Sequence, residues 1–177
     1  MNNESNGIGN NYDDLLKERL TMVRDWKLLN GETLGYSRLG LKYFGSEDLV
    51  LQAGRRFYPR PLPAETKKMK GRECYKNALL YASKNNLLYC EGFAYARETG
   101  SALEIPHAWA VDKKGYVIDP TWGEGLAYFG IAFSLDYVLK ITLRDEHYGM
   151  IPDVPRGRHN PFLNGYPSGA IFTAFEE

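Results

Sequence analysis

The pattern of apolar and polar positions predicts helices and strands that alternate along the chain. Leu16, Leu20 and Val23 recur at three- and four-residue spacing, as on the buried face of a helix. From Leu87 to Arg97 the side chains alternate between two faces at the period of a strand. The expected helices span residues 12–29, 46–54, 72–84 and 135–144, and the expected strands span residues 87–97, 105–112, 116–121, 128–133 and 170–175. This order favours an α+β fold in which a helix packs on a small antiparallel sheet.

Residues 105–121 are predicted to form a hairpin closed by the loop Lys113-Lys114-Gly115. A three-residue hairpin loop favours glycine in its last position, where the backbone is left-handed. With this loop, His107 and Asp119 lie on the same face of the hairpin as diagonal neighbours, within reach of each other. A two-residue loop would instead place the two side chains on opposite faces.

The chain is expected to form one domain, residues 12–177, after a disordered leader, residues 1–11. The leader is rich in Asn, Gly, Ser and Glu and has almost no apolar side chain, so it cannot contribute to a core. The remaining length suffices for one hydrophobic core. Residues 57–70 contain three prolines and are predicted to form a loop that leads into the helix at 72–84.

Composition and charge describe an ordinary globular chain. Of the 177 residues, 44% are apolar, and the formal net charge is zero, which indicates neither a nucleic-acid duplex nor a membrane surface as a partner. The sequence contains no apolar run of about 20 residues and no secretory leader, so we expect a cytoplasmic protein. Lys and Arg cluster between Arg55 and Arg72, which fits either a solvated basic loop or a basic rim that faces substrate.

Three residues far apart in the sequence carry the candidate chemistry. Cys74 stands at the start of the predicted helix 72–84, where the helix dipole favours the thiolate. His107 lies in the predicted strand 105–112 and can act as a general base. Asp119, in the predicted strand 116–121, can orient its imidazole. Cys, His and Asp in these positions are typical of thiol-dependent nucleophilic catalysis.

The local sequences around these residues resemble the transglutaminase-like branch of the papain-like cysteine protease superfamily. The resemblance rests on Cys74 at a helix start, on His107-Ala108-Trp109 and on Asp119-Pro120-Thr121-Trp122. It covers about fifty residues. It implies a papain-like core and a catalytic triad of Cys74, His107 and Asp119. It also implies acyl transfer from an amide through a thioester, with the acyl group passing to water or to an amine.

Other residues are candidates for binding the substrate or stabilising an oxyanion. Asn77 lies one turn after Cys74, where it can contact substrate or bond the backbone. Glu91 is expected at the surface, with a polar pocket as the alternative. Trp109 is expected to shield the triad, although core packing alone would also explain it. Tyr58 is a candidate for substrate contact and, like Gln52, for the second oxyanion donor beside the backbone N–H of Cys74.

Several functions remain open on the sequence alone. A cysteine hydrolase acting as a protease, amidase or deamidase is favoured over a transglutaminase, because water is always present. Its substrate would be a protein, a peptide or a small amide, and no cofactor is expected. The alternatives are a binding module with a degraded site and an enzyme whose Cys74 acts on a nucleotide-like signalling molecule. A zinc site is disfavoured, since Cys74, Cys90, His107, His147 and His159 form no close pair.

Overall fold

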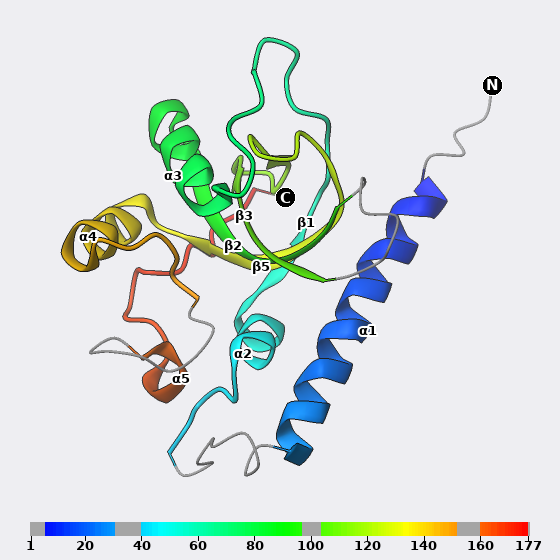
Figure 1. The fold of residues 1–177 in the computed structure, drawn as a ribbon, viewed down its shortest axis with the longest axis vertical. Helices are drawn as coiled ribbons and strands as arrows, with labels where there is room; N and C mark the ends of the chain where they lie inside the picture. Colours follow the sequence, from blue (N-terminus) through cyan, green and yellow to red (C-terminus); the bar gives the residue numbers. More distant parts are fainter. Residues whose placement is uncertain (1–5, 31–39, 97–103, 152–159, 177) are drawn as a thin grey trace.

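The computed structural model describes residues 6–30, 40–96, 104–151 and 160–176, and for residues 6–10 the backbone alone. In this part of the chain, helices and antiparallel strands form the α+β fold that the sequence predicts (Figure 1). The elements in order are α1 (Asn6–Asn30), α2 (Ser46–Ala53), β1 (Arg55–Phe57), α3 (Cys74–Asn85), β2 (Leu88–Ala96), β3 (Ile105–Val111), β4 (Val117–Ile118), β5 (Gly125–Phe133), α4 (Leu135–Asp145) and α5 (Pro161–Asn164).

The sheet is strongly curled, and its two edges meet. Its strand order is β1-β5-β2-β3-β4, with every neighbouring pair antiparallel. The chain after β1 closes the curl: the N–H of Tyr58 donates to the carbonyl of Gly115 at 2.9 Å, and the N–H of Val117 donates to the carbonyl of Tyr58 at 2.9 Å. At the centre, Gly92 of β2 pairs with Gly130 of β5, and a Cβ at Gly92 would lie 2.3 Å from the carbonyl oxygen of Phe129.

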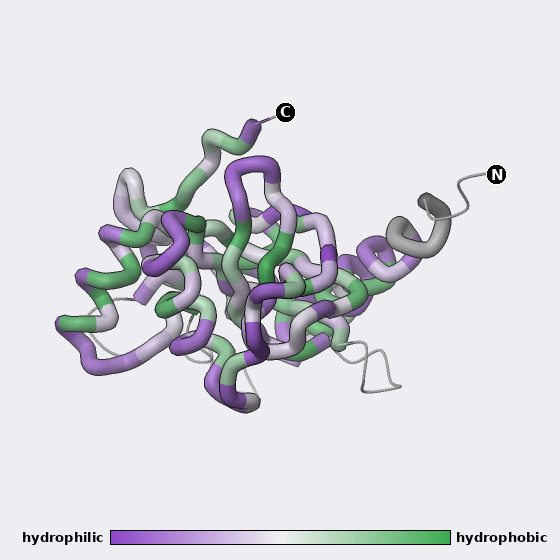
Figure 2. The backbone as a smooth tube through the Cα atoms, turned by 90° about the horizontal axis from the view of Figure 1, so that it is seen from above, coloured by the Kyte–Doolittle hydropathy of each residue, from purple (hydrophilic) through white to green (hydrophobic). Residues whose placement is uncertain are grey.

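The curl separates two hydrophobic cores. The outer core joins the sheet to the helices, with Leu16 and Leu20 from α1 and Tyr89 and Phe93 from β2 among its members. The inner core consists mainly of strand side chains, which are Phe57, Cys90, Ala94, Trp109, Val111, Val117, Tyr128 and Ala132. The alternation predicted for residues 87–97 is therefore confirmed, because successive residues of β2 enter different cores. Figure 2 shows hydrophilic positions on the loop tips and on the outward turns of the helices.

The hairpin loop and the helix after β5 form as predicted, but the second strand of the hairpin, expected over residues 116–121, is limited to Val117–Ile118. Gly115 has φ 85°, and the N–H of Asp112 donates to the carbonyl of Tyr116, so the loop has the expected three residues. Ser134 caps α4, its hydroxyl accepting from the N–H of Tyr137 at 3.4 Å. These local signals predict well because each depends on neighbouring residues alone.

Other segments differ from the prediction. Helix α1 begins at Asn6, so residues 6–11, expected in the leader, are helical; once a helix is nucleated, each added residue gains a hydrogen bond. Strand β1 lies between the expected helix 46–54 and the expected loop 57–70 and takes in Phe57 of that loop, because pairing with β5 overrides the local sequence. In place of a strand at 170–175, Ile171 makes a single bridge to Phe133. None of the helices in the described ranges has the length and apolar content of a membrane crossing.

Candidate active site

Helix α3 places Cys74 at its positive end. Cys74 is the first residue of the helix and is partly exposed, two residues later than the predicted start. The first intrahelical hydrogen bond runs from the N–H of Asn77 to the carbonyl of Glu73 at 2.8 Å, so the N–H of Cys74 has no carbonyl partner in its own helix. The thiol therefore sits where the helix dipole favours negative charge.

Glu73 precedes Cys74, but its negative charge is compensated by lysines. Its side chain makes no capping hydrogen bond to the helix. One carboxylate oxygen bonds Lys70, and the other lies 3.6 Å from the ammonium of Lys76. The hydrogen bond from Lys70 is the main cause of a lowered pKa for Glu73. These two lysines reduce the repulsion that Glu73 would otherwise exert on a thiolate at Cys74.

His107 and Asp119 meet inside the curl of the sheet. The imidazole of His107 is 2% exposed, and its Nε2 lies 2.8 Å from Oδ2 of Asp119. This contact confirms the predicted hairpin register. Because Asp119 occupies Nε2, the nitrogen left for the thiol of Cys74 is Nδ1. Burial of His107 opposes its protonation, but hydrogen bonds and charge from Asp119 and Cys74 outweigh burial, so the pKa of His107 is raised.

Asp119 is fixed by four donors. Its Oδ1 accepts from the backbone N–H groups of Thr121 at 2.8 Å and Trp122 at 3.0 Å. Its Oδ2 accepts from the hydroxyl of Tyr128 at 2.9 Å and faces the imidazole of His107. Burial acts to raise the pKa of Asp119, but these interactions, led by His107, hold it below its ordinary value. An ionised carboxylate is thus oriented against the imidazole, as a Cys–His–Asp site requires.

Aromatic rings surround the imidazole of His107. The indole of Trp122 stacks on it, with centroids 3.6 Å apart and planes 9° apart. The ring centroid of Trp109 lies 6.3 Å from that of His107, and its indole is fully buried in the inner core. The ring of Tyr128 is 6.4 Å away. Trp109 is therefore a packing residue of the inner core and offers no surface to a substrate.

Asn77 is buried, and its amide group is engaged within the protein. Its Nδ2 donates to the carbonyl of Lys70 at 2.7 Å and to the hydroxyl of Thr121 at 3.0 Å. Of the two roles expected for Asn77, the structure provides the internal one. The amide ties α3 to the preceding loop and to the turn that carries Asp119, and so fixes Cys74 relative to the other two side chains.

The expectation that Glu91 lies at the surface is wrong. Its side chain is 1% exposed and accepts hydrogen bonds from the hydroxyl of Tyr89 and from the N–H groups of Met150 and Ile151. Burial raises the pKa of Glu91 to about 7 against the effect of these donors. The sequence could not reveal this, because Met150 and Ile151 lie about sixty residues away. Glu91 also lines a small hollow with Tyr75 and Pro106, the neighbours of Cys74 and His107 in the chain.

The two candidates for a second oxyanion donor lie elsewhere. The amide of Gln52 donates to the carboxylate of Asp48 at 2.9 Å within α2. Tyr58 is 43% exposed and packs on Tyr116 beside the hairpin loop, with ring centroids 5.6 Å apart. The structure thus brings neither Gln52 nor Tyr58 to Cys74, whose own backbone N–H remains the donor that the helix start supplies.

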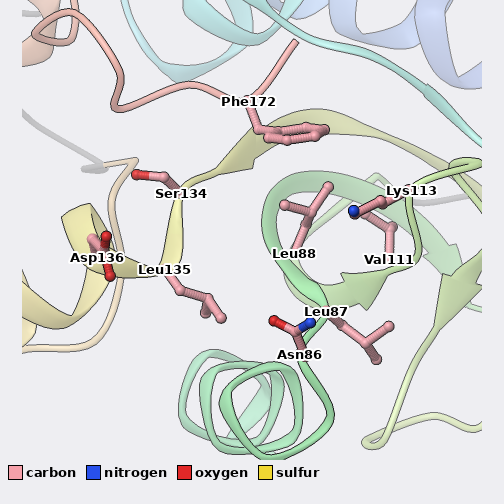
Figure 3. Close-up of a pocket in the computed structure, with 9 residues that line it drawn as sticks. All are labelled: Asn86, Leu87, Leu88, Val111, Lys113, Ser134, Leu135, Asp136 and Phe172. Carbon is pink, nitrogen blue, oxygen red and sulfur yellow. The ribbon is translucent and has the colours of Figure 1, made fainter. Parts of the chain in front are cut away.

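A larger hollow lies at the far end of α3 (Figure 3). It has a volume of about 350 Å³, and Asn86, the C-cap of α3, is on its wall opposite Phe172. Since α3 has 12 residues, its length of about 18 Å separates this hollow from Cys74. The hollow is therefore distinct from the candidate active site.

Metal ligands do not gather in the described ranges. Within them, no three side chains of His, Cys, Asp or Glu lie close enough to hold an ion. His147 is exposed near Gly149 and Tyr75, and His159 lies outside the described residues.

Tyr128 takes part in the site through a contact with Asp119 that the sequence does not reveal. Its hydroxyl donates to Asp119, and its ring joins the inner core. It opens the predicted strand 128–133, but nothing in the sequence fixes how that strand pairs. The pairing of β5 with β2, which the sequence leaves undefined, brings Tyr128 to the triad.

Comparisons with protein-family models, curated proteins and solved structures find no match to this chain. Any assignment of function therefore rests on the residues themselves and on their geometry.

Proposed function

We propose that the protein is a cysteine-dependent hydrolase or acyl transferase with a transglutaminase-like, papain-like core and a Cys74–His107–Asp119 triad. The observation that supports this most is the buried 2.8 Å contact between Nε2 of His107 and Oδ2 of Asp119, with Cys74 interacting with the same imidazole. A histidine that served only to pack the core would need neither an ionised aspartate on one ring nitrogen nor a thiol near the other. The local sequences around the three residues support the same family.

The reaction begins with transfer of the thiol proton of Cys74 to His107. The thiolate attacks the carbonyl carbon of an amide, and the backbone N–H of Cys74 donates to the oxygen that gains charge. The imidazolium of His107 then protonates the leaving nitrogen, the C–N bond breaks, and a thioester remains on Cys74. Water or an amine attacks the thioester while His107 accepts its proton, which releases the product and restores the thiol. Asp119 stabilises the imidazolium throughout.

Formation of a thioester tests the proposal without knowledge of the natural substrate. Treatment with p-nitrophenyl acetate should acetylate Cys74, which intact-mass and peptide analysis would locate, and hydroxylamine should reverse the modification. Cys74→Ala should abolish acetylation, and His107→Ala should slow it about 100-fold or more. Acetylation of His107→Ala at the wild-type rate would refute a catalytic histidine and favour a binding module. Decay of the thioester with and without added amine would separate hydrolysis from transfer.

A further inference from the structure

Basic residues are concentrated in the segment that leads to Cys74. Residues 59–73 contain five Lys or Arg side chains and two Glu side chains, in a chain whose formal net charge is zero. The five basic residues are Arg60, Lys67, Lys68, Lys70 and Arg72. We refer to residues 59–73 as the basic loop; in Figure 1 it projects from the end of the sheet before the chain enters α3.

Backbone hydrogen bonds hold the basic loop against the turn that carries Asp119. The N–H of Leu62 donates to the carbonyl of Gly123 at 2.8 Å, and the N–H of Met69 donates to the carbonyl of Pro120 at 2.7 Å. The side chain of Lys68 lies over the same turn, with its Cε 2.5 Å from where a Cβ of Gly123 would be. The basic loop is thus held in a fixed position next to the turn that carries Asp119.

Arg72 has a backbone conformation that the helix start does not explain. Its φ is 64°, in the left-handed region that non-glycine residues rarely adopt. The other described non-glycine residues with positive φ, Asn86 and Glu146, are helix C-caps, where this conformation is common. Arg72 instead lies two residues before Cys74, exposed to solvent. Such outliers cluster at functional sites, where the backbone aims a side chain.

Glu73, the acidic residue next to Arg72 in the chain, does not neutralise the positive charge of Arg72. Glu73 bonds Lys70 and Lys76, so its carboxylate is already shared between two ammonium groups. Arg60, at the far end of the loop, pairs with Asp112 at 3.2 Å. The structure gives no ion pair between Arg72 and any acidic side chain in the described ranges. Arg72 therefore keeps a positive charge two residues before Cys74, and such a charge raises the local concentration of anions.

We propose that the basic loop binds an anionic group of the substrate, so that the amide attacked by Cys74 belongs to a molecule with carboxylate or phosphate groups close by. This inference rests on the proposed function of Cys74 and specifies its substrate class. Arg72 contacts the anion, Lys67 and Lys68 add positive charge, and the hydrogen bonds of the basic loop to the Asp119 turn keep the anion close to the thiol.

Two alkylating reagents of similar size but different charge test the loop directly. Iodoacetate is an anion and iodoacetamide is neutral, so the ratio of their rate constants at Cys74 reports the local field and cancels changes in thiol reactivity. In Lys68→Gln/Arg72→Gln this ratio should fall about 3- to 10-fold at low ionic strength, and less at high salt. Lys67→Gln/Lys68→Gln, which leaves the backbone at Arg72 unchanged, should lower it in the same direction.

A matched control removes two positive charges elsewhere. Lys113→Gln/Lys114→Gln changes the hairpin loop and should leave the ratio at its wild-type value. Equal ratios in all four proteins would overturn the inference. Failure of the proposed function would look different, since Cys74 would then react no faster with iodoacetamide than a model thiol does.

Competition assays distinguish the two sources of negative charge. Protection of Cys74 from iodoacetamide by triglutamate, with chloride at equal ionic strength as the reference, would assign carboxylates. Protection by inorganic phosphate would assign phosphate groups. If neither anion protects Cys74 at millimolar concentration, the basic loop is not a binding site and the inference fails.

Discussion

The indole of Trp122 lies flat on the imidazole of His107, with ring centroids 3.6 Å apart and planes 9° apart. An imidazolium is attracted to the face of an indole, so this stack stabilises the protonated form of His107 and keeps water from it. Trp122→Ala should therefore reduce the reactivity of Cys74 near pH 6, which alkylation rates would measure. Trp122→Phe keeps an aromatic face and should retain most of that reactivity. Equal rates in the two variants would show that the stack serves packing alone.

Asp119→Asn should lower the pKa of His107. The carboxylate raises this pKa through a hydrogen bond and its charge, and the amide lacks the charge. Because a less stable imidazolium supports less thiolate, the onset of fast Cys74 alkylation should consequently move to higher pH in the variant. The four donors around Asp119 also suit a carboxylate, so chemical denaturation should show a loss of about 1–3 kcal/mol in the free energy of unfolding. An unchanged pH profile would argue against Asp119 as the residue that positions His107.

Glu91 should make the stability of the protein depend on pH near neutrality. Burial raises its folded-state pKa from 4.5 to about 7, so the folded protein binds this proton more tightly than the unfolded chain does. The stabilisation is complete below about pH 4.5 and is lost as pH rises through 7. Each pKa unit corresponds to about 1.4 kcal/mol, which gives a change of roughly 3 kcal/mol.

The variant Glu91→Gln isolates this contribution, because the amide does not titrate. Its free energy of unfolding, measured by urea denaturation from pH 5 to 8.5, should decline less with pH than that of the wild type. The variant should be less stable than the wild type at low pH. In the wild type the N–H of Ile151 donates to Oε2 of Glu91, and in the variant it would face the NH2 group of Gln, which is also a donor. Parallel stability curves for the two proteins would contradict a buried, titrating Glu91.

Gly92 should tolerate no side chain. A Cβ at this position would lie 2.3 Å from the carbonyl oxygen of Phe129 and 2.4 Å from the Cα of Gly130, and neither backbone atom can move freely. Gly92→Ala should cost about 1–3 kcal/mol or more in the free energy of unfolding. Gly71→Ala is the matched control, because nothing lies within 4 Å of its Cβ position. Thermal unfolding of both variants measures the difference, and equal melting temperatures would refute the close packing of β2 on β5.

Local patterns in the sequence predicted much of the site. The hairpin loop ending at Gly115 fixed the register that joins His107 to Asp119, and the helix start placed Cys74. These features depend on short-range rules of turn and helix geometry. The predictions stopped where distant segments meet: the burial of Glu91 depends on Met150 and Ile151.

The curl of the sheet also could not be predicted from local patterns in the sequence. The bridge from Tyr58 to Tyr116 joins residues that are far apart in the sequence, and no local pattern around either one indicates it. The resulting inner core buries Trp109 and brings the hydroxyl of Tyr128 to Asp119. Both consequences depend on strand pairing, which periodicity alone does not determine.

The central claim is that His107 activates Cys74, and alkylation of Cys74 by iodoacetamide between pH 5 and 9 tests it most directly. Peptide mapping separates Cys74 from Cys90, which is fully buried with its pKa raised by burial and serves as an unreactive internal reference. At pH 6 Cys74 should react about 10-fold or more faster than a model thiol, whose pKa near 8.5 leaves little thiolate. His107→Ala should abolish this advantage while far-ultraviolet circular dichroism stays unchanged. A wild-type Cys74 that reacts no faster than the model thiol, or an advantage that survives in His107→Ala, would contradict the account.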